Sequence, residues 1–130
     1  MVFREKIWQR QFPGESGQQI RDFASRIDDQ NPIHHSDTFA KNVGLDMIVA
    51  TGVRIMGFVS STIGNELPGA MIRRIEDIKF PKPLYPGVPV VVRCSVVHFR
   101  YPIAKVKAEV IIGSGNVGEC ICTLAFLKRN

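Results

Sequence analysis

The stretch from Thr51 to Ile63 constrains the fold more than any other part of the chain. Its apolar side chains point in almost every direction around a helix: Val53, Ile55, Met56, Phe58, Val59 and Ile63. A helix that is apolar all round is buried rather than amphipathic. Thr51 is a good N-cap, and Gly52 falls in the first turn, where backbone N–H groups lack partners within the helix. We therefore predict a long buried helix that begins at Thr51-Gly52.

The chain after this helix has the pattern of strands and turns. Residues 71–80 are ambiguous because their isoleucines recur every three positions, but the flanking Pro68-Gly69 and Pro81 favour a strand. Valine enrichment and alternation predict further strands over 89–99, 104–112 and 117–127, with a turn at 113–116. A buried helix followed by antiparallel strands implies an α+β fold in which the sheet wraps around that helix.

The first part of the chain is expected to supply a strand and an amphipathic helix. Residues 4–12 are predicted to be a strand. Ser16 followed by Gln19 is a capping-box signature, so a helix should begin near Gly17. We expect this helix to break at Asn31-Pro32, because a residue that precedes proline is pushed out of the α region.

An acid and an imidazole lie on either side of that break, at Asp29 and His34. Residues five apart do not share a face of a continuous helix, so only the non-helical segment can bring them together. A carboxylate beside an imidazole can hold a water molecule and move its protons near neutral pH. The alternative is a solvated loop with surface histidines. His35 is expected to be exposed rather than catalytic, and His98 to be a pairing or edge residue of a strand.

The length predicts a single domain, and the charge pattern gives no support to a nucleic-acid-binding protein. At 130 residues, we expect residues 1–130 to form one domain. The net charge is +5, but the basic residues are scattered and form no recognised nucleic-acid motif. A mildly basic surface suits a phosphorylated, anionic small molecule equally well.

The longest apolar run argues against a membrane-spanning protein, and the cysteines argue against a protein held together by disulfides. The run at 47–63 contains Arg54 and is shorter than the roughly 20 residues that a membrane span needs. The first residues have no apolar signal-peptide core, so we expect a cytoplasmic protein without membrane association. An odd count of cysteines, with Cys120 and Cys122 on one face of a strand and Cys94 on another strand, indicates free thiols rather than disulfides. No metal site is expected.

Several motifs resemble one family, in that family's order, along nearly the whole chain. They are D-Q-N-P-I-H at 29–34 preceded by Phe23-Ala24, then Phe39-Ala40, Gly52, Leu67-Pro68-Gly69, and F-P-K-P-L-Y-P-G at 80–87. This pattern resembles the MaoC-like family of (3R)-specific enoyl-CoA hydratases and 3-hydroxyacyl-thioester dehydratases. The resemblance implies a hot-dog fold, a hydro-lyase of fatty-acid metabolism, and a homodimer. It implies neither a metal nor a redox cofactor, with coenzyme A or acyl carrier protein serving only as part of the substrate.

The resemblance also assigns roles to individual residues. Asp29 and His34 would hold the water that adds to the double bond of a trans-2-enoyl thioester. The Gly52 N–H, at the positive end of the helix dipole, would stabilise the negative charge that builds on the thioester oxygen. Asn31 would help to hold the site together. Thr51 and Val53, which flank Gly52, would contact the substrate.

Two departures from the family pattern leave alternatives open. Thr51 stands where the family usually has histidine, and Ile27-Asp28 stand where it often has serine or threonine followed by glycine. A second carboxylate beside Asp29 should raise the pKa of one of the pair if the two side chains approach each other. The alternatives are a hot-dog acyl-CoA thioesterase and a non-catalytic acyl-thioester-binding or scaffold protein. The acyl chain length and the choice between coenzyme A and carrier protein are not determined by the sequence.

Overall fold

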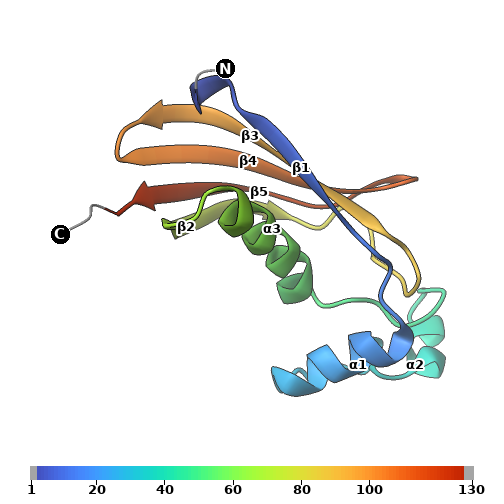
Figure 1. Ribbon diagram of the computed structural model, residues 1–130. Coiled ribbons are helices and arrows are strands. Elements are labelled where there is room, and N and C mark those ends of the chain that lie inside the picture. Colours follow the sequence, from blue (N-terminus) through green and yellow to red (C-terminus); the bar gives the residue numbers. More distant parts are fainter. Residues whose placement is uncertain (1–2, 128–130) are drawn as a thin grey trace.

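The computed structural model describes residues 3–127, in which a curved sheet wraps around one long helix (Figure 1). The helices are α1 (Gly17–Arg26), α2 (Asp37–Asn42), α3 (Gly52–Glu66) and the short 3-10 helices η1 (Phe3–Glu5) and η2 (Pro32–His34). The strands are β1 (Ile7–Phe12), β2 (Ala70–Lys79), β3 (Val90–Arg100), β4 (Ile103–Ile112) and β5 (Gly115–Phe126). No helix of this part of the chain is long and apolar enough to cross a membrane.

The five strands form one antiparallel sheet in the order β1-β3-β4-β5-β2. β1 and β2 are therefore the two edges, although β2 follows directly after α3 in sequence. Helix α3 lies against the concave face of this sheet, whereas α1 and α2 stand apart from the sheet, near the β2–β3 connection (Figure 1). The predicted α+β hot-dog fold, a sheet wrapped around a central helix, is confirmed.

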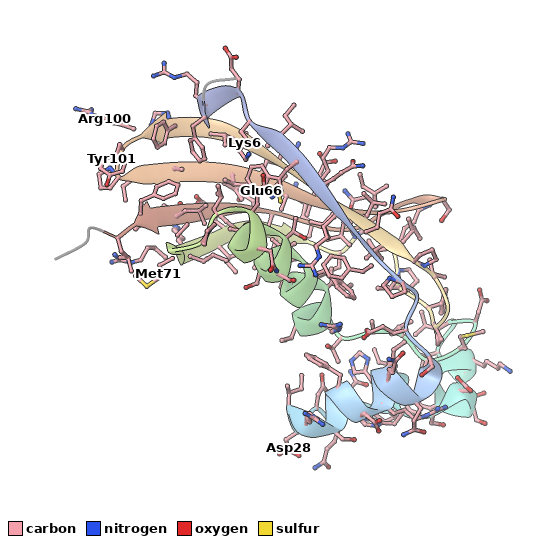
Figure 2. The ribbon with its side chains drawn as sticks, viewed as in Figure 1. Lys6, Asp28, Glu66, Met71, Arg100 and Tyr101 are labelled. Atoms are coloured by element: carbon pink, nitrogen blue, oxygen red, sulfur yellow. The ribbon has the colours of Figure 1, made fainter. Side chains whose placement is uncertain are left out.

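The core forms where α3 meets the sheet. Gly118 of β5 allows a close approach there, because a Cβ at this position would lie 2.6 Å from Cγ2 of Ile55. Trp8 of β1 donates its indole N–H to the Thr62 carbonyl at 3.1 Å. At the C-terminal end of the helix, Glu66 pairs with Lys6 at 2.8 Å, and Figure 2 shows both side chains between β1 and α3. These contacts fix how the helix sits on the sheet.

We predicted that α3 is buried on every side, and in the single chain this is wrong. The helix buries Ile55, Phe58, Val59, Thr62 and Ile63. On the other side, Val53 is 61% exposed, and Ser60 and Gly64 are also exposed. The sheet curves around the helix from one direction only, so the opposite face of α3 remains uncovered.

The N-terminal part differs from prediction in two places. The first strand starts at Ile7 rather than at residue 4, because residues 3–5 form η1, where the Phe3 ring packs 4.6 Å from that of Phe99. Helix α1 begins at Gly17 behind the predicted capping box. It ends at Arg26 rather than at Asn31-Pro32, because Asp28 adopts a left-handed conformation with φ of 56°. Aspartate tolerates this region better than most residues.

The strand predicted over 71–80 is β2 (Ala70–Lys79), which ends one residue earlier than predicted, and its irregular pairing explains the ambiguous pattern. The register of β2 against β5 shifts between Ile72 and Arg74 and again between Glu76 and Lys79. An extra residue at such a bulge interrupts the alternation of faces that defines a strand. The spacing of three between the isoleucines is therefore compatible with an edge strand.

The C-terminal hairpin is tighter than predicted, and the cysteines lie as expected. Ile112 already pairs with Gly115, so the turn consists of Gly113 and Ser114 rather than the whole of 113–116. All three cysteines are free and buried. The sulfur atoms of Cys120 and Cys122 lie 3.8 Å apart on one face of β5.

Candidate active site

Asp29 is held in place from several directions. Its backbone N–H donates to the Ala24 carbonyl at 2.8 Å, which ties it to the last turn of α1. Its carboxylate oxygen Oδ1 accepts a hydrogen bond from the backbone N–H of Asn31 at 3.1 Å. This short loop bends because of the left-handed Asp28 and because the Asn31 side chain caps η2 by accepting from the Ile33 N–H. Only the second oxygen, Oδ2, has no partner within the loop.

His34 is buried, with 7% of its surface exposed, and its tautomer follows from its neighbour. Its Nδ1 lies 2.7 Å from the Val49 carbonyl oxygen. A carbonyl oxygen only accepts, so Nδ1 carries the proton and Nε2 of the neutral ring keeps a lone pair. The backbone N–H of His34 donates to the Asn31 carbonyl at 3.0 Å, which fixes the ring from its own chain.

The predicted pair therefore meets through its two remaining atoms. His34 Nε2 and Asp29 Oδ2 lie 3.6 Å apart. This is too long for a direct hydrogen bond and is a separation at which a bridging water has to be considered. Both atoms are acceptors, so a single water molecule can donate one hydrogen to each. The pair that the sequence placed on either side of a helix break converges through the 3-10 turn of η2.

Gly52 and His34 line one cavity of about 230 Å³. Its inner wall is apolar and includes Ile55 and Leu84, both buried, while Lys82 lies at its exposed rim. Gly52 is the first residue of α3, so its N–H has no acceptor within the helix, and none is found elsewhere in residues 3–127. The donor that the sequence analysis selected thus borders the same cavity as the buried imidazole.

Thr51 acts as the N-cap that was predicted for it. It is 2% exposed, and its hydroxyl oxygen accepts from the Arg54 N–H at 3.0 Å. Phe80 covers Gly52 from the sheet side, because a Cβ at Gly52 would lie 2.9 Å from the ring atom Cζ. Val53 points outward and does not line the cavity, and neither does Asn31, whose contacts are within its own loop. Contact of Asn31 and Val53 with the substrate therefore stays a prediction.

The second carboxylate does not join the pair. Asp28 lies at the end of α1 that is remote from the sheet (Figure 2), and its Oδ1 accepts from the Gln30 side chain at 2.9 Å.

His35 has a contact that the sequence did not predict. We expected an exposed bystander, but the ring is half-buried, and its Nε2 lies 2.7 Å from the backbone carbonyl oxygen of Asp29. The carbonyl of His35 in turn accepts from Arg21 Nε at 3.0 Å. The only signal in the sequence was its position beside His34.

Other parts of the structure offer less chemistry. A larger groove of about 700 Å³ lies between β1, β3 and β4, and none of its lining residues is titratable. Within residues 3–127, no group of His, Cys, Asp or Glu side chains is arranged to hold a metal ion. The cavity beside His34 and Gly52 combines an apolar wall with a buried imidazole and a helix N–H that has no acceptor within residues 3–127.

Comparison with known proteins identifies the family. The MaoC-like domain matches residues 9–119, which is most of the chain and includes Asp29, His34 and Gly52. The chain belongs to the MaoC-like family. No curated protein sequence matches this chain significantly.

Solved structures share the MaoC-like fold at low sequence identity. A chain of the ChsH1–ChsH2 complex from Mycobacterium tuberculosis superimposes with a TM-score of 0.88 at 19% identity, covering 98% of this chain and 100% of that one. The (R)-hydratase from A. caviae involved in PHA biosynthesis has a TM-score of 0.87 at 18% identity, with 97% and 98% covered. The HadBC (3R-hydroxyacyl-ACP dehydratase) complex from Mycobacterium tuberculosis has a TM-score of 0.77 at 20% identity, with 95% and 97% covered.

Proposed function

We propose that this MaoC-like chain is a hydro-lyase that reversibly hydrates trans-2-enoyl thioesters to (3R)-3-hydroxyacyl thioesters. The observation that carries the proposal is the 3.6 Å gap between His34 Nε2 and Asp29 Oδ2. Every other polar atom of the two functional groups is already bonded, so the gap presents two acceptors to a water molecule. The family and the hydratases among its structural relatives support the same reaction.

In the proposed reaction, Asp29 and His34 hold one water over C3 of the substrate. The water oxygen bonds to C3, the pair takes a proton from it, and a proton is delivered to C2, so that one molecule of water adds across the double bond. Negative charge builds on the thioester oxygen as C3 is attacked. The Gly52 N–H, with the N-terminal dipole of α3, faces that charge, and such a donor typically contributes about 100- to 1000-fold in turnover.

The cavity supports an acyl thioester as the substrate. Its apolar wall suits an acyl group, and Lys82 at the rim suits the phosphates of coenzyme A or of a carrier protein's prosthetic arm. Lys82 donates to the Ser114 carbonyl at 2.6 Å, which places its ammonium at the turn between β4 and β5. No redox cofactor is proposed, because the reaction neither oxidises nor reduces the substrate.

We further propose that the working form is at least a homodimer. The uncovered face of α3 and the edge strand β2 leave apolar side chains in solvent, including Val53 at 61% exposure and Met71 at 42%. A second chain that covers these surfaces would complete the burial that the apolar pattern of α3 predicts. Two of the matched structures come from complexes of differently named chains, so light scattering should be run on this chain alone.

The test is the absorbance of the enoyl-thioester band with crotonyl-CoA, measured for the wild type, Asp29→Asn and His34→Ala. We expect the band to decay without thiol release in the wild type. Each variant should be slower by about 100-fold or more, the usual contribution of a positioned acid or base. Thiol release in place of hydration would establish the thioesterase. Binding of acyl-CoA without turnover, even with a longer enoyl chain, would establish the non-catalytic binding protein.

A further inference from the structure

We infer that His35 is a positioning residue for the reaction: its imidazole anchors the loop that carries Asp29. The inference rests on the proposed function for its catalytic meaning. The anchoring contact is the hydrogen bond from His35 Nε2 to the Asp29 carbonyl oxygen, at 2.7 Å. Because the carbonyl only accepts, Nε2 must be the donor.

This contact completes the attachment of Asp29. The N–H of Asp29 is held by the Ala24 carbonyl, and its Oδ1 is held by the Asn31 N–H. The carbonyl is the remaining backbone group, and His35 is the side chain that binds it. With all three bonds in place, Oδ2 is left facing His34, whereas without the third bond the peptide between Asp29 and Gln30 can rotate.

His35 is itself fixed, so it can transmit order to the loop. Its backbone N–H donates to the Pro32 carbonyl at 3.0 Å, and its carbonyl accepts from Arg21 Nε at 3.0 Å. Arg21 also approaches Asp37, at 3.6 Å, and the other oxygen of Asp37 accepts from the Ile48 N–H at 2.9 Å. Through its imidazole and its backbone, His35 therefore links the loop to η2 and α1, and through Arg21 to α2, while its ring touches no reacting atom.

The experiment compares His35→Gln, His35→Asn and His35→Leu with the wild type. The Gln amide nitrogen stands as many bonds from Cβ as the imidazole Nε2, so Gln can restore the donor. The Asn amide is one bond shorter and should not reach. His98, an exposed histidine on β3, supplies the matched control as His98→Leu.

We expect His35→Leu and His35→Asn to lower kcat for crotonyl-CoA hydration roughly 10- to 100-fold, with KM changed less than about threefold. His35→Gln should recover most of kcat, and His98→Leu should match the wild type. Amide exchange of residues 27–33 should quicken in His35→Leu and return to the wild-type rate in His35→Gln.

Two results would overturn the inference. One is wild-type kcat in His35→Leu when the wild type is active. The other is unchanged exchange of residues 27–33 in His35→Leu, which decides the question even if the wild type hydrates no enoyl thioester. If the wild type hydrates no enoyl thioester, the proposed function fails, and the exchange rates alone decide whether His35 holds the loop in place.

Discussion

At the scale of single residues, Gly52 has a backbone N–H that is free within residues 3–127 and no room for a side chain. A methyl group on its Cα would meet the Phe80 ring at 2.9 Å, so the ring or the first turn of α3 has to move. We predict that Gly52→Ala lowers kcat/KM roughly 10- to 100-fold, because a displaced donor no longer matches the thioester oxygen. Steady-state hydration kinetics of the variant, with circular dichroism to confirm folding, would measure this.

The control for that substitution lies on the same helix. Gly64 has nothing within 4 Å of an added Cβ and is exposed. Gly64→Ala should therefore leave hydration unchanged and raise the free energy of unfolding by about 0.5–1 kcal/mol through helix propensity. If Gly52→Ala behaved in the same way as Gly64→Ala, the Gly52 N–H would have no special place in the reaction.

Local residue types predicted part of the site and not the rest. Asp29, His34 and Gly52 were selected because the motifs that contain them resemble one family in that family's order, and the structure brings His34 close to Asp29 and beside Gly52. The left-handed backbone of Asp28 and the hydrogen bond from His35 depend on the path of the loop through space. No spacing rule along the chain encodes that path.

At the scale of secondary-structure elements, α1 matters because its last turn holds Asp29. The Ser16 side chain accepts from the Gln19 N–H, and the Gln19 side chain accepts from the Ser16 N–H. We predict that Ser16→Ala destabilises the protein by about 1 kcal/mol, since the Gln19 N–H in the first turn of the helix loses its acceptor. Thermal unfolding followed by circular dichroism measures the effect.

Ser25, exposed on the same helix, provides the comparison. Its side chain makes no hydrogen bond within residues 3–127, so Ser25→Ala should be neutral or slightly stabilising through helix propensity. Equal melting temperatures for Ser16→Ala and Ser25→Ala would show that the cap does not limit the stability of the protein.

The elements themselves were largely predictable because each has a local cause. The capping box starts α1, Thr51 starts α3, and alternation marks β3 to β5. The bulges of β2 and the one-sided burial of α3 were missed, because both depend on neighbours distant in sequence. An edge strand and an uncovered helix face are properties of the assembled sheet.

At the scale of the whole molecule, the buried thiols link stability to alkaline pH. Burial raises the pKa of the Cys94 thiol from 9.0 to about 12, with a smaller contribution from Cys120. Because the folded-state pKa is the higher one, this stabilisation is complete below pH 9.0 and is lost as pH rises toward about 12. We predict that stability falls over this interval by at most about 1.4 kcal/mol per pH unit for this group.

Urea unfolding at a series of pH values would measure this dependence, with Cys94→Ala as the comparison. The variant should be less stable at pH 8 because it leaves a cavity, and its stability should fall less steeply above pH 9. Parallel pH profiles for the variant and the wild type would assign the alkaline loss to other groups. The profile is independent of catalysis, so it tests the core rather than the site.

The two ends of the molecule carry different kinds of side chain. The site lies near α1, and Tyr101 and Arg100 mark the far tip of the β3–β4 hairpin, whereas Asp28 lies at the opposite end (Figure 2). Near that tip, the rings of Phe3, Phe99 and Phe126 pack edge to face, with ring centroids 4.6–6.3 Å apart. Aromatic contacts thus close one end of the sheet, and the reactive groups occupy the other.

The indole of Trp8 gives the chain an optical signal of its own. It is the sole tryptophan, and it donates to the Thr62 carbonyl, so its surroundings change if α3 and β1 separate. Emission excited at the indole band therefore reports the seating of the helix on the sheet without any added dye. A ligand at the mouth of the cavity that leaves the helix in place should leave this emission unchanged, whereas unfolding should shift it to longer wavelength.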